Sequence, residues 1–156
     1  MAARVHRINV NPEGGVPKHR VASTRLLQGG VEGDKQRDLR YHGGPRRAVC
    51  LFSLERLRAL AEEGHALGPG SLGENLTIEG LDWDAVRPGM RFAVGGAVIE
   101  ITKDAPPCKT LVACFVGGDF TRVSAKTHPG WSRLYASVLR EGTVREGDEV
   151  LESREA

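Results

Sequence analysis

The chain has 156 residues, of which 40% are hydrophobic and 27% are charged, and its formal net charge is +2. This length and balance are typical of one domain, so we expect residues 1–156 to fold as a single unit without a metal or disulfide. The charge is too small to indicate nucleic acid or an anionic membrane as a partner. No apolar run approaches the roughly 20 residues of a membrane span, and the N-terminus lacks a signal-peptide stretch. We therefore expect a cytoplasmic protein.

Short β-branched stretches, separated by Gly, Pro and Asp, predict a domain built mainly of strands. Val5–Val10 alternates loosely, and Ala48–Phe52 is a continuous apolar run of the kind found in strands buried on both faces. Asn75–Ile78 alternates again. Arg91–Val94 and Ala97–Ile101 flank a Gly-Gly pair, which predicts a hairpin.

Helical patterning occurs at two places. Ser53 fits an N-cap, and the apolar stripe that follows it ends at Gly64. Trp131–Leu139 carries apolar residues at helical spacing, and Gly142 follows as its stop. Many short strands with two helices favour an α+β, strand-rich, β-barrel-like domain, although periodicity does not define which barrel.

The three cysteines, Cys50, Cys108 and Cys114, are an odd number without zinc-site spacing, so we expect free thiols in a reducing compartment. Cys108 follows two prolines, which rigidify its approach, and Lys109 beside it favours the thiolate if the two side chains meet. A rigid, loop-borne thiolate suits a nucleophile or a soft-metal ligand, although a cysteine is also commonly a small buried hydrophobe. Cys50 and Cys114 lie in apolar runs and are assigned to packing.

A second group of candidate residues lies in the basic segment 30–47. Gly43 and Gly44 allow the backbone to approach a ligand closely, and backbone N–H groups with Arg nearby suit a phosphate. His42 is a candidate proton shuttle. The alternative is a solvated loop whose acidic residues offset its charge. The positive side chains of the segment are Lys35, Arg37, Arg40, Arg46 and Arg47.

A third group follows the glycine-rich stretch 68–73. Glu74 offers a carboxylate acceptor, and Asn75 offers an amide with both donors and an acceptor. Such a pair suits the edge of a heterocycle, but it equally satisfies its own turn. Lys18 belongs to a smaller basic patch upstream. There is no Walker loop and no Gly-x-Gly-x-x-Gly fingerprint after a strand.

The order and spacing of these segments resemble the MOSC (molybdenum cofactor sulfurase C-terminal) family, in its small stand-alone bacterial branch. The resemblance covers nearly the whole chain, and no single piece is decisive. It implies a strand-rich β-barrel similar to the barrel domain of pyruvate kinase. The main matching pieces are Gly15–Lys18, Gly33–Cys50, Gly70–Thr77, Pro106–Thr110 and Gly130–Tyr135.

The resemblance also implies a cofactor and a set of roles. The cofactor is the molybdenum cofactor, a pterin with a phosphate and a dithiolene-bound metal. Cys108 matches the late functional cysteine of the family and would bind molybdenum, with Lys109 and His42 beside it at the substrate. The residues that would hold the pterin and its phosphate are Lys18, Arg40, Gly43, Gly44, Arg46, Glu74 and Asn75.

Two readings of function follow from the resemblance. The first is a reductase of N-hydroxylated compounds such as base analogues or hydroxylamines. Because the chain lacks a ferredoxin-like cysteine set, its electrons would come from a separate protein. The second is a sulfur carrier with a persulfide on Cys108, or a cofactor-binding module without turnover of its own. A barrel that only binds a partner is a third possibility.

Overall fold

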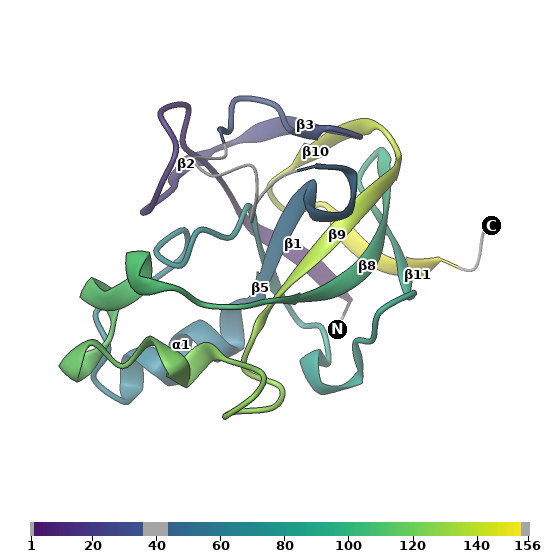
Figure 1. Ribbon diagram of the computed structural model, residues 1–156. Helices are drawn as coiled ribbons and strands as arrows, with labels where there is room; N and C mark the ends of the chain where they lie inside the picture. Colours follow the sequence, from purple (N-terminus) through teal and green to yellow (C-terminus); the bar gives the residue numbers. More distant parts are fainter. Residues whose placement is uncertain (1, 36–43, 154–156) are drawn as a thin grey trace.

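A computed structural model of the protein describes residues 2–35 and 44–153. The strands of the eight-stranded main sheet, apart from β2, close into a barrel because β11 also pairs with β1 (Figure 1). The pair β5–β6 is parallel and the other barrel pairs are antiparallel. In order around the barrel the strands are β11 (Glu149–Ser153), β7 (Arg91–Val94), β8 (Ala97–Ala105), β9 (Arg133–Arg140), β5 (Val49–Ser53), β6 (Leu76–Glu79) and β1 (Ala3–Val10). The predicted strand-rich barrel is confirmed.

Further strands flank the barrel. β2 (His19–Val21) pairs with β1 outside the closed ring. A second sheet contains β10 (Gly142–Arg145), β3 (Ser23–Leu27) and β4 (Gly30–Val31), in that order. Its apolar side chains, such as that of Leu26, belong to the same buried core as those of the barrel. The two sheets therefore share the main core.

The predicted central strand and hairpin are both present. Every residue of β5 is buried, as the continuous apolar run Ala48–Phe52 predicts for a strand covered on both faces. Phe52 packs edge-on against Trp83 of the short 3-10 helix η2 (Trp83–Ala85), with ring centroids 5.9 Å apart. β7 and β8 are antiparallel and pair Val94 with Ala97 across the Gly-Gly turn.

The first predicted helix is also confirmed. α1 (Leu54–Glu62) is capped by Ser53, whose hydroxyl accepts a hydrogen bond from the backbone N–H of Arg56 at 3.1 Å. Its leucine stripe is buried against the barrel. Three 3-10 helices, η3 (Lys109–Cys114), η4 (Val116–Gly118) and η5 (Phe120–Val123), lie beside it (Figure 1). Arg122 joins them to α1 by a two-pronged ion pair with Glu63 at 2.7 and 2.9 Å.

The second predicted helix is wrong. Most of Trp131–Leu139 forms β9, whose edges pair with β8 and β5. Apolar residues near positions i, i+3 and i+4 fit a helix, but a strand buried on both faces produces a similar dense apolar run. The two neighbouring strands decide the outcome, because they satisfy the backbone hydrogen bonds on both sides of β9. Among the described residues, no helix is long and apolar enough to cross a membrane.

Candidate functional site

Cys108 lies where the barrel strand β8 gives way to η3. β8 ends at Ala105, two prolines follow, and Cys108 is the extended residue that caps η3. Its thiol is half-buried, and its Sγ lies 2.9 Å from the hydroxyl of Thr110. The thiol is therefore held in a loop that two proline rings restrict, with part of its surface open to solvent.

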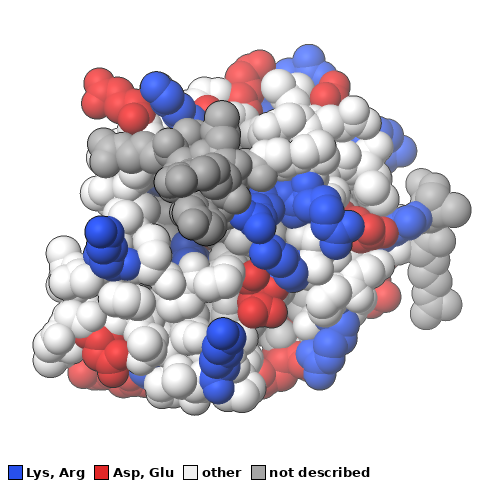
Figure 2. Space-filling view, viewed as in Figure 1, with Lys and Arg blue, Asp and Glu red and all other residues white. Residues whose placement is uncertain are grey.

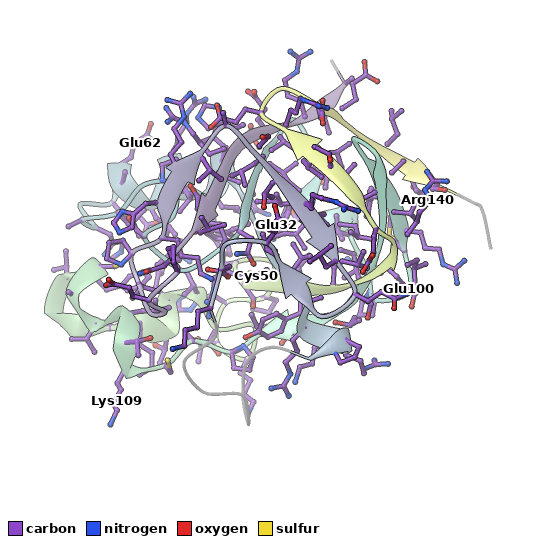
Figure 3. The ribbon with its side chains drawn as sticks, turned by 90° about the horizontal axis from the view of Figure 1, so that it is seen from above. Glu32, Cys50, Glu62, Glu100, Lys109 and Arg140 are labelled. Atoms are coloured by element: carbon purple, nitrogen blue, oxygen red, sulfur yellow. The ribbon has the colours of Figure 1, made fainter. Side chains whose placement is uncertain are left out.

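Lys109 begins η3 and is exposed. Its side chain points outward from the body of the domain (Figure 3). The Cys108 sulfur has the Thr110 hydroxyl, and not Lys109, as its hydrogen-bond partner. A contact between the ammonium group and the thiol, on which the sequence argument depended, is thus not part of this arrangement, and the role of Lys109 stays a prediction.

Cys50 and Tyr135 face each other across the pair β5–β9 and form a small buried cluster with Ala105. Burial raises the pKa of the Cys50 thiol from its ordinary 9.0 to about 11. Burial also raises the pKa of Tyr135 to about 12, and Cys50 and Cys108 add to this rise while Arg133 and Arg47 oppose it. Both groups keep their protons near neutral pH. Cys50 lies in the interior (Figure 3), as its apolar neighbours predict.

Cys114 is half-buried at the end of η3. Its Sγ donates to the backbone carbonyl of Ser71 at 3.7 Å, and burial raises its pKa. Cys114 also packs against the main core. This agrees with a packing role, although more of it is exposed than its apolar sequence neighbours suggest.

Part of the basic segment lies close to Tyr135. The guanidinium carbon of Arg47 is 5.9 Å from the centre of the Tyr135 ring. The short 3-10 helix η1 (Pro45–Arg47) is held against β8, because the Thr102 hydroxyl donates to the Arg46 carbonyl at 2.6 Å. Gly44 begins η1 with a φ of 82°, which favours glycine.

Figure 2 shows Lys and Arg side chains gathered on this face, over the region where η1 lies beside β9. Arg46 is exposed there, and Arg47 is half-buried. Tyr135 thus lies beside both η1 and the end of β8, because Arg47 lies over its ring and Ala105, three residues before Cys108, belongs to the same buried cluster. Arg40, His42 and Gly43 lie outside the described residues.

Lys18 is buried and forms an ion pair with the buried carboxylate of Asp34. The same carboxylate accepts from the side-chain amide of Asn75 at 2.9 Å and from the backbone of Asn11 at 2.8 Å. Asn75 also donates to the Asn9 carbonyl and accepts from the backbone N–H of Cys50. The charge of Lys18 is therefore already neutralised, and both amide hydrogens of Asn75 are already used within the protein.

Glu74 is completely buried, and burial raises the pKa of its carboxyl group. One oxygen accepts from the Gly70 backbone at 3.2 Å and from the Thr77 hydroxyl at 2.9 Å. The other oxygen has no hydrogen-bond partner among the described residues. In this arrangement Glu74 and Asn75 shape the loop from inside, and direct contact of either with a pterin remains a prediction.

Several residues of the site carried no sequence-based assignment to it. The sequence predicts only that acidic residues offset the charge of the basic segment, yet one of them, Asp34, joins Lys18 to Asn75. Arg133 and Tyr135 lay inside a segment assigned to a helix. The sequence signal for Arg133 is its position at the start of an apolar run. Such a run is expected to be buried, and a buried cation is rare enough to indicate a specific role.

The described residues contain no group of three or more His, Cys, Asp or Glu that could hold a metal ion. A metal at Cys108 would thus not find a complete set of protein ligands in the described part of the chain. A metal that arrives with its own ligands, as in an organic cofactor, fits this donor set.

The MOSC domain model matches residues 38–151. The chain is 34% identical over 137 residues to the uncharacterized protein YflK of Bacillus subtilis, covering 86% of this chain and 61% of YflK. It is 33% identical over 147 residues to the protein YiiM of Escherichia coli, covering 88% of this chain and 64% of YiiM. The chain thus spans somewhat less than two thirds of the length of these relatives.

Solved structures give the same fold. YiiM from Escherichia coli superposes with a TM-score of 0.75 at 25% identity, covering all of this chain and 71% of that one. YiiM from Geobacillus stearothermophilus gives a TM-score of 0.77 at 24% identity, covering 97% and 75%. The YUAD protein of Bacillus subtilis gives 0.74 at 20%, covering 99% and 98%, and shows the fold alone. The family model covers most of the chain, and with the two curated relatives it shows that this chain belongs to the MOSC domain family.

Proposed function

We propose that this domain binds the molybdenum cofactor with Cys108 as the protein ligand to the metal. We further propose that it reduces N-hydroxylated compounds with electrons from a separate donor protein. The observation that carries the proposal is the setting of Cys108: a half-buried thiol on a proline-stiffened loop that follows Ala105, which packs with Tyr135 beside the cationic helix η1. Family membership supports the choice of cofactor.

The residues around the thiol fit such a group. A thiolate is the soft donor that molybdenum accepts, and the described residues offer no competing cluster of hard ligands. Arg46 and Arg47 supply positive charge for a phosphate, with the exposed Arg46 the more accessible of the two. The bound metal would supply the redox chemistry.

The residues of the chain itself would bind and orient the cofactor. Reduction of a hydroxylamine to an amine takes up two electrons and two protons, breaks the N–O bond and releases water. Cys108 would anchor the metal, and the arginines of η1 would orient the anionic cofactor. Tyr135 would stay neutral beside them, because burial raises its pKa to about 12. A neutral neighbour adds no negative charge to repel an anionic cofactor.

The test is metal and pterin analysis of protein purified from a host that makes the cofactor. We expect the wild-type protein and Cys114→Ser each to contain one molybdenum and one pterin per protein molecule. We expect Cys108→Ser to contain neither. Reduction of an N-hydroxylated base analogue with an artificial electron donor should follow the same pattern. Molybdenum bound equally well by Cys108→Ser would contradict the assignment.

A sulfur carrier is the second candidate. It is favoured by a partly exposed thiol at Cys108 and by the finding that the described residues hold no group of three or more His, Cys, Asp or Glu that could bind a metal. A persulfide on Cys108 needs only an accessible thiol. The same preparation separates the two candidates, because sulfane sulfur on Cys108 without molybdenum would identify the carrier.

A further inference from the structure

Arg133 is a buried cation at the first position of β9, directly behind the loop that carries Cys108. Only 6% of the residue is exposed. One terminal nitrogen of its guanidinium donates to the Leu72 carbonyl at 2.8 Å. The other donates to the carbonyls of Ala105 and Pro106 at 3.3 and 3.1 Å. Its Nε is buried without a hydrogen-bond partner among the described residues.

The three carbonyls belong to two loops that are distant in the sequence. The carbonyls of Ala105 and Pro106 each precede a proline nitrogen and lead directly to Cys108. Because each of these two residues precedes a proline, its ψ is already confined to extended values, and hydrogen bonds to its carbonyl hold the loop further. The Leu72 carbonyl lies in the glycine-rich loop that ends at Glu74 and Asn75. One planar guanidinium therefore joins both loops, and its rigid donor geometry sets their relative position.

The positive charge of Arg133 indicates that this residue does more than connect the two loops. A buried cation is costly unless an opposite charge or strong hydrogen bonds offset it, and neutral carbonyls offset only part of that cost. Glu74, which is also buried and has one unpartnered oxygen, interacts electrostatically with Arg133. A neutral amide could tie two loops with less desolvation. The charged fork is the better device where three acceptors must be held in one fixed geometry.

We propose that Arg133 is a positioning residue for Cys108, which holds the cysteine loop and the Leu72–Glu74 loop in one fixed arrangement. The proposal rests on the proposed function only in taking Cys108 as the working thiol. Arg133 itself contacts backbone carbonyls and needs no contact with a cofactor or substrate.

The test uses hydrogen–deuterium exchange of the full chain without added cofactor. Two amides report on the two loops, because Leu111 donates to the Cys108 carbonyl at 3.0 Å and Gly73 donates to the Gly70 carbonyl at 3.2 Å. In Arg133→Ala we expect exchange of both amides to rise together by about tenfold or more, which corresponds to about 1.4 kcal/mol of lost local protection. Exchange within β5 and α1 should stay unchanged.

Chemical rescue separates positioning from a merely structural role. Guanidinium ion, at concentrations far below those that unfold proteins, should restore protection at both amides of Arg133→Ala. Urea is neutral and of similar shape, and it should not. A residue that only stabilises the whole fold would raise exchange everywhere, and neither additive would reverse that effect.

A matched control is Arg56→Ala. Arg56 also donates to a backbone carbonyl, that of Gly130 at 3.1 Å, but it contacts neither loop. It should leave both reporter amides unchanged. Exchange that rises in only one loop, or rescue by urea as good as by guanidinium, would overturn the proposal.

If Arg133→Ala does not fold, Arg133→Lys gives the same test, because it keeps the charge and loses the planar fork. Both amides should again exchange faster together, and unchanged exchange would overturn the proposal. The outcome is separate from that of the metal analysis. Absence of molybdenum would contradict the proposed function without altering the exchange rates, and unchanged exchange would remove the role of Arg133 while Cys108 could still bind the metal.

Discussion

At the scale of single residues, the surroundings separate the three cysteines. Burial raises the pKa of Cys50 and of Cys114, and Cys114 packs against the main core, whereas Cys108 lies on a loop that follows two prolines. The sequence predicts this division, because apolar neighbours flank the first two and prolines precede the third. It could not place Tyr135 opposite Cys50, since that contact depends on the register between β5 and β9.

Serine substitutions should separate the two roles of cysteine. Cys108→Ser should leave the thermal midpoint unchanged and abolish cofactor loading and reduction, because a hydroxyl does not ionise near neutral pH and is a harder ligand. Cys50→Ser should lower stability by about 1–3 kcal/mol, because it buries a hydroxyl among apolar neighbours. Thermal unfolding and an activity assay measure both. Full activity in Cys108→Ser would contradict the reductase and the sulfur carrier alike, and would favour a binding module.

The buried pair Lys18–Asp34 should contribute far more to stability than an exposed pair. Lys18→Met leaves the Asp34 carboxylate buried without its counter-ion, so we expect a loss of about 3–5 kcal/mol. Arg20→Met is the matched control, because Arg20 is exposed where it pairs with Glu146, and its loss should cost far less than the loss of Lys18. Urea unfolding measures both. Equal losses of stability in the two variants would contradict the larger contribution of the buried pair.

At the scale of elements, local patterns identify a strand or helix well when one signal dominates. The run of β5, the Gly-Gly hairpin and the Ser53 cap are such cases. β9 is the opposite case, because its apolar spacing fits two structures and only its pairing with β8 and β5 decides between them. The ties within the site are equally non-local: Asn75 and Asp34 lie 41 positions apart, and Arg133 and Leu72 lie 61 apart.

The glycine-rich loop before β6 should depend strictly on Gly70. Its φ is +87°, and an added Cβ would lie 2.4 Å from the backbone oxygen of Lys18. Gly89 has a similar φ of +92° but open space around it. Gly89→Ala should therefore cost about 1–2 kcal/mol from backbone strain alone. Gly70→Ala should cost clearly more, because the Lys18 backbone must also move. Denaturant unfolding of the two variants measures the difference, and equal losses would contradict the steric argument.

At the scale of the whole molecule, the closed barrel places the site on strands that neighbour one another. β8 leads into the Cys108 loop, β9 supplies Arg133 and Tyr135, and β5 supplies Cys50. Because β9 lies between the other two, its side chains meet both the cysteine loop and the interior. The buried residues Cys50 and Tyr135 therefore belong both to the surroundings of the site and to the interior of the barrel. Because both side chains can ionise, the stability of the barrel depends on pH through them.

The barrel should lose stability at alkaline pH. The pKa of Cys50 rises from 9.0 to about 11 on burial, and that of Tyr135 from 10.0 to about 12. The unfolded chain therefore releases these protons at lower pH than the folded chain. The stability gained is complete below about pH 9 and is lost as pH rises through about 11 to 12. For Cys50 alone, a shift of about two pKa units corresponds to a loss on the order of 3 kcal/mol.

Unfolding by urea at a series of alkaline pH values tests this sign. The free energy of unfolding should fall steadily above about pH 9 in the wild-type protein. Cys50→Ala should flatten this fall, because it removes the buried thiol that the unfolded chain ionises first. Cys114→Ala is the control and should change this fall less, since Cys114 is only half-buried. Tyr135→Phe should reduce the fall mainly at the upper end of the pH range. A wild-type slope retained in Cys50→Ala would show that other groups control the alkaline limit of the fold.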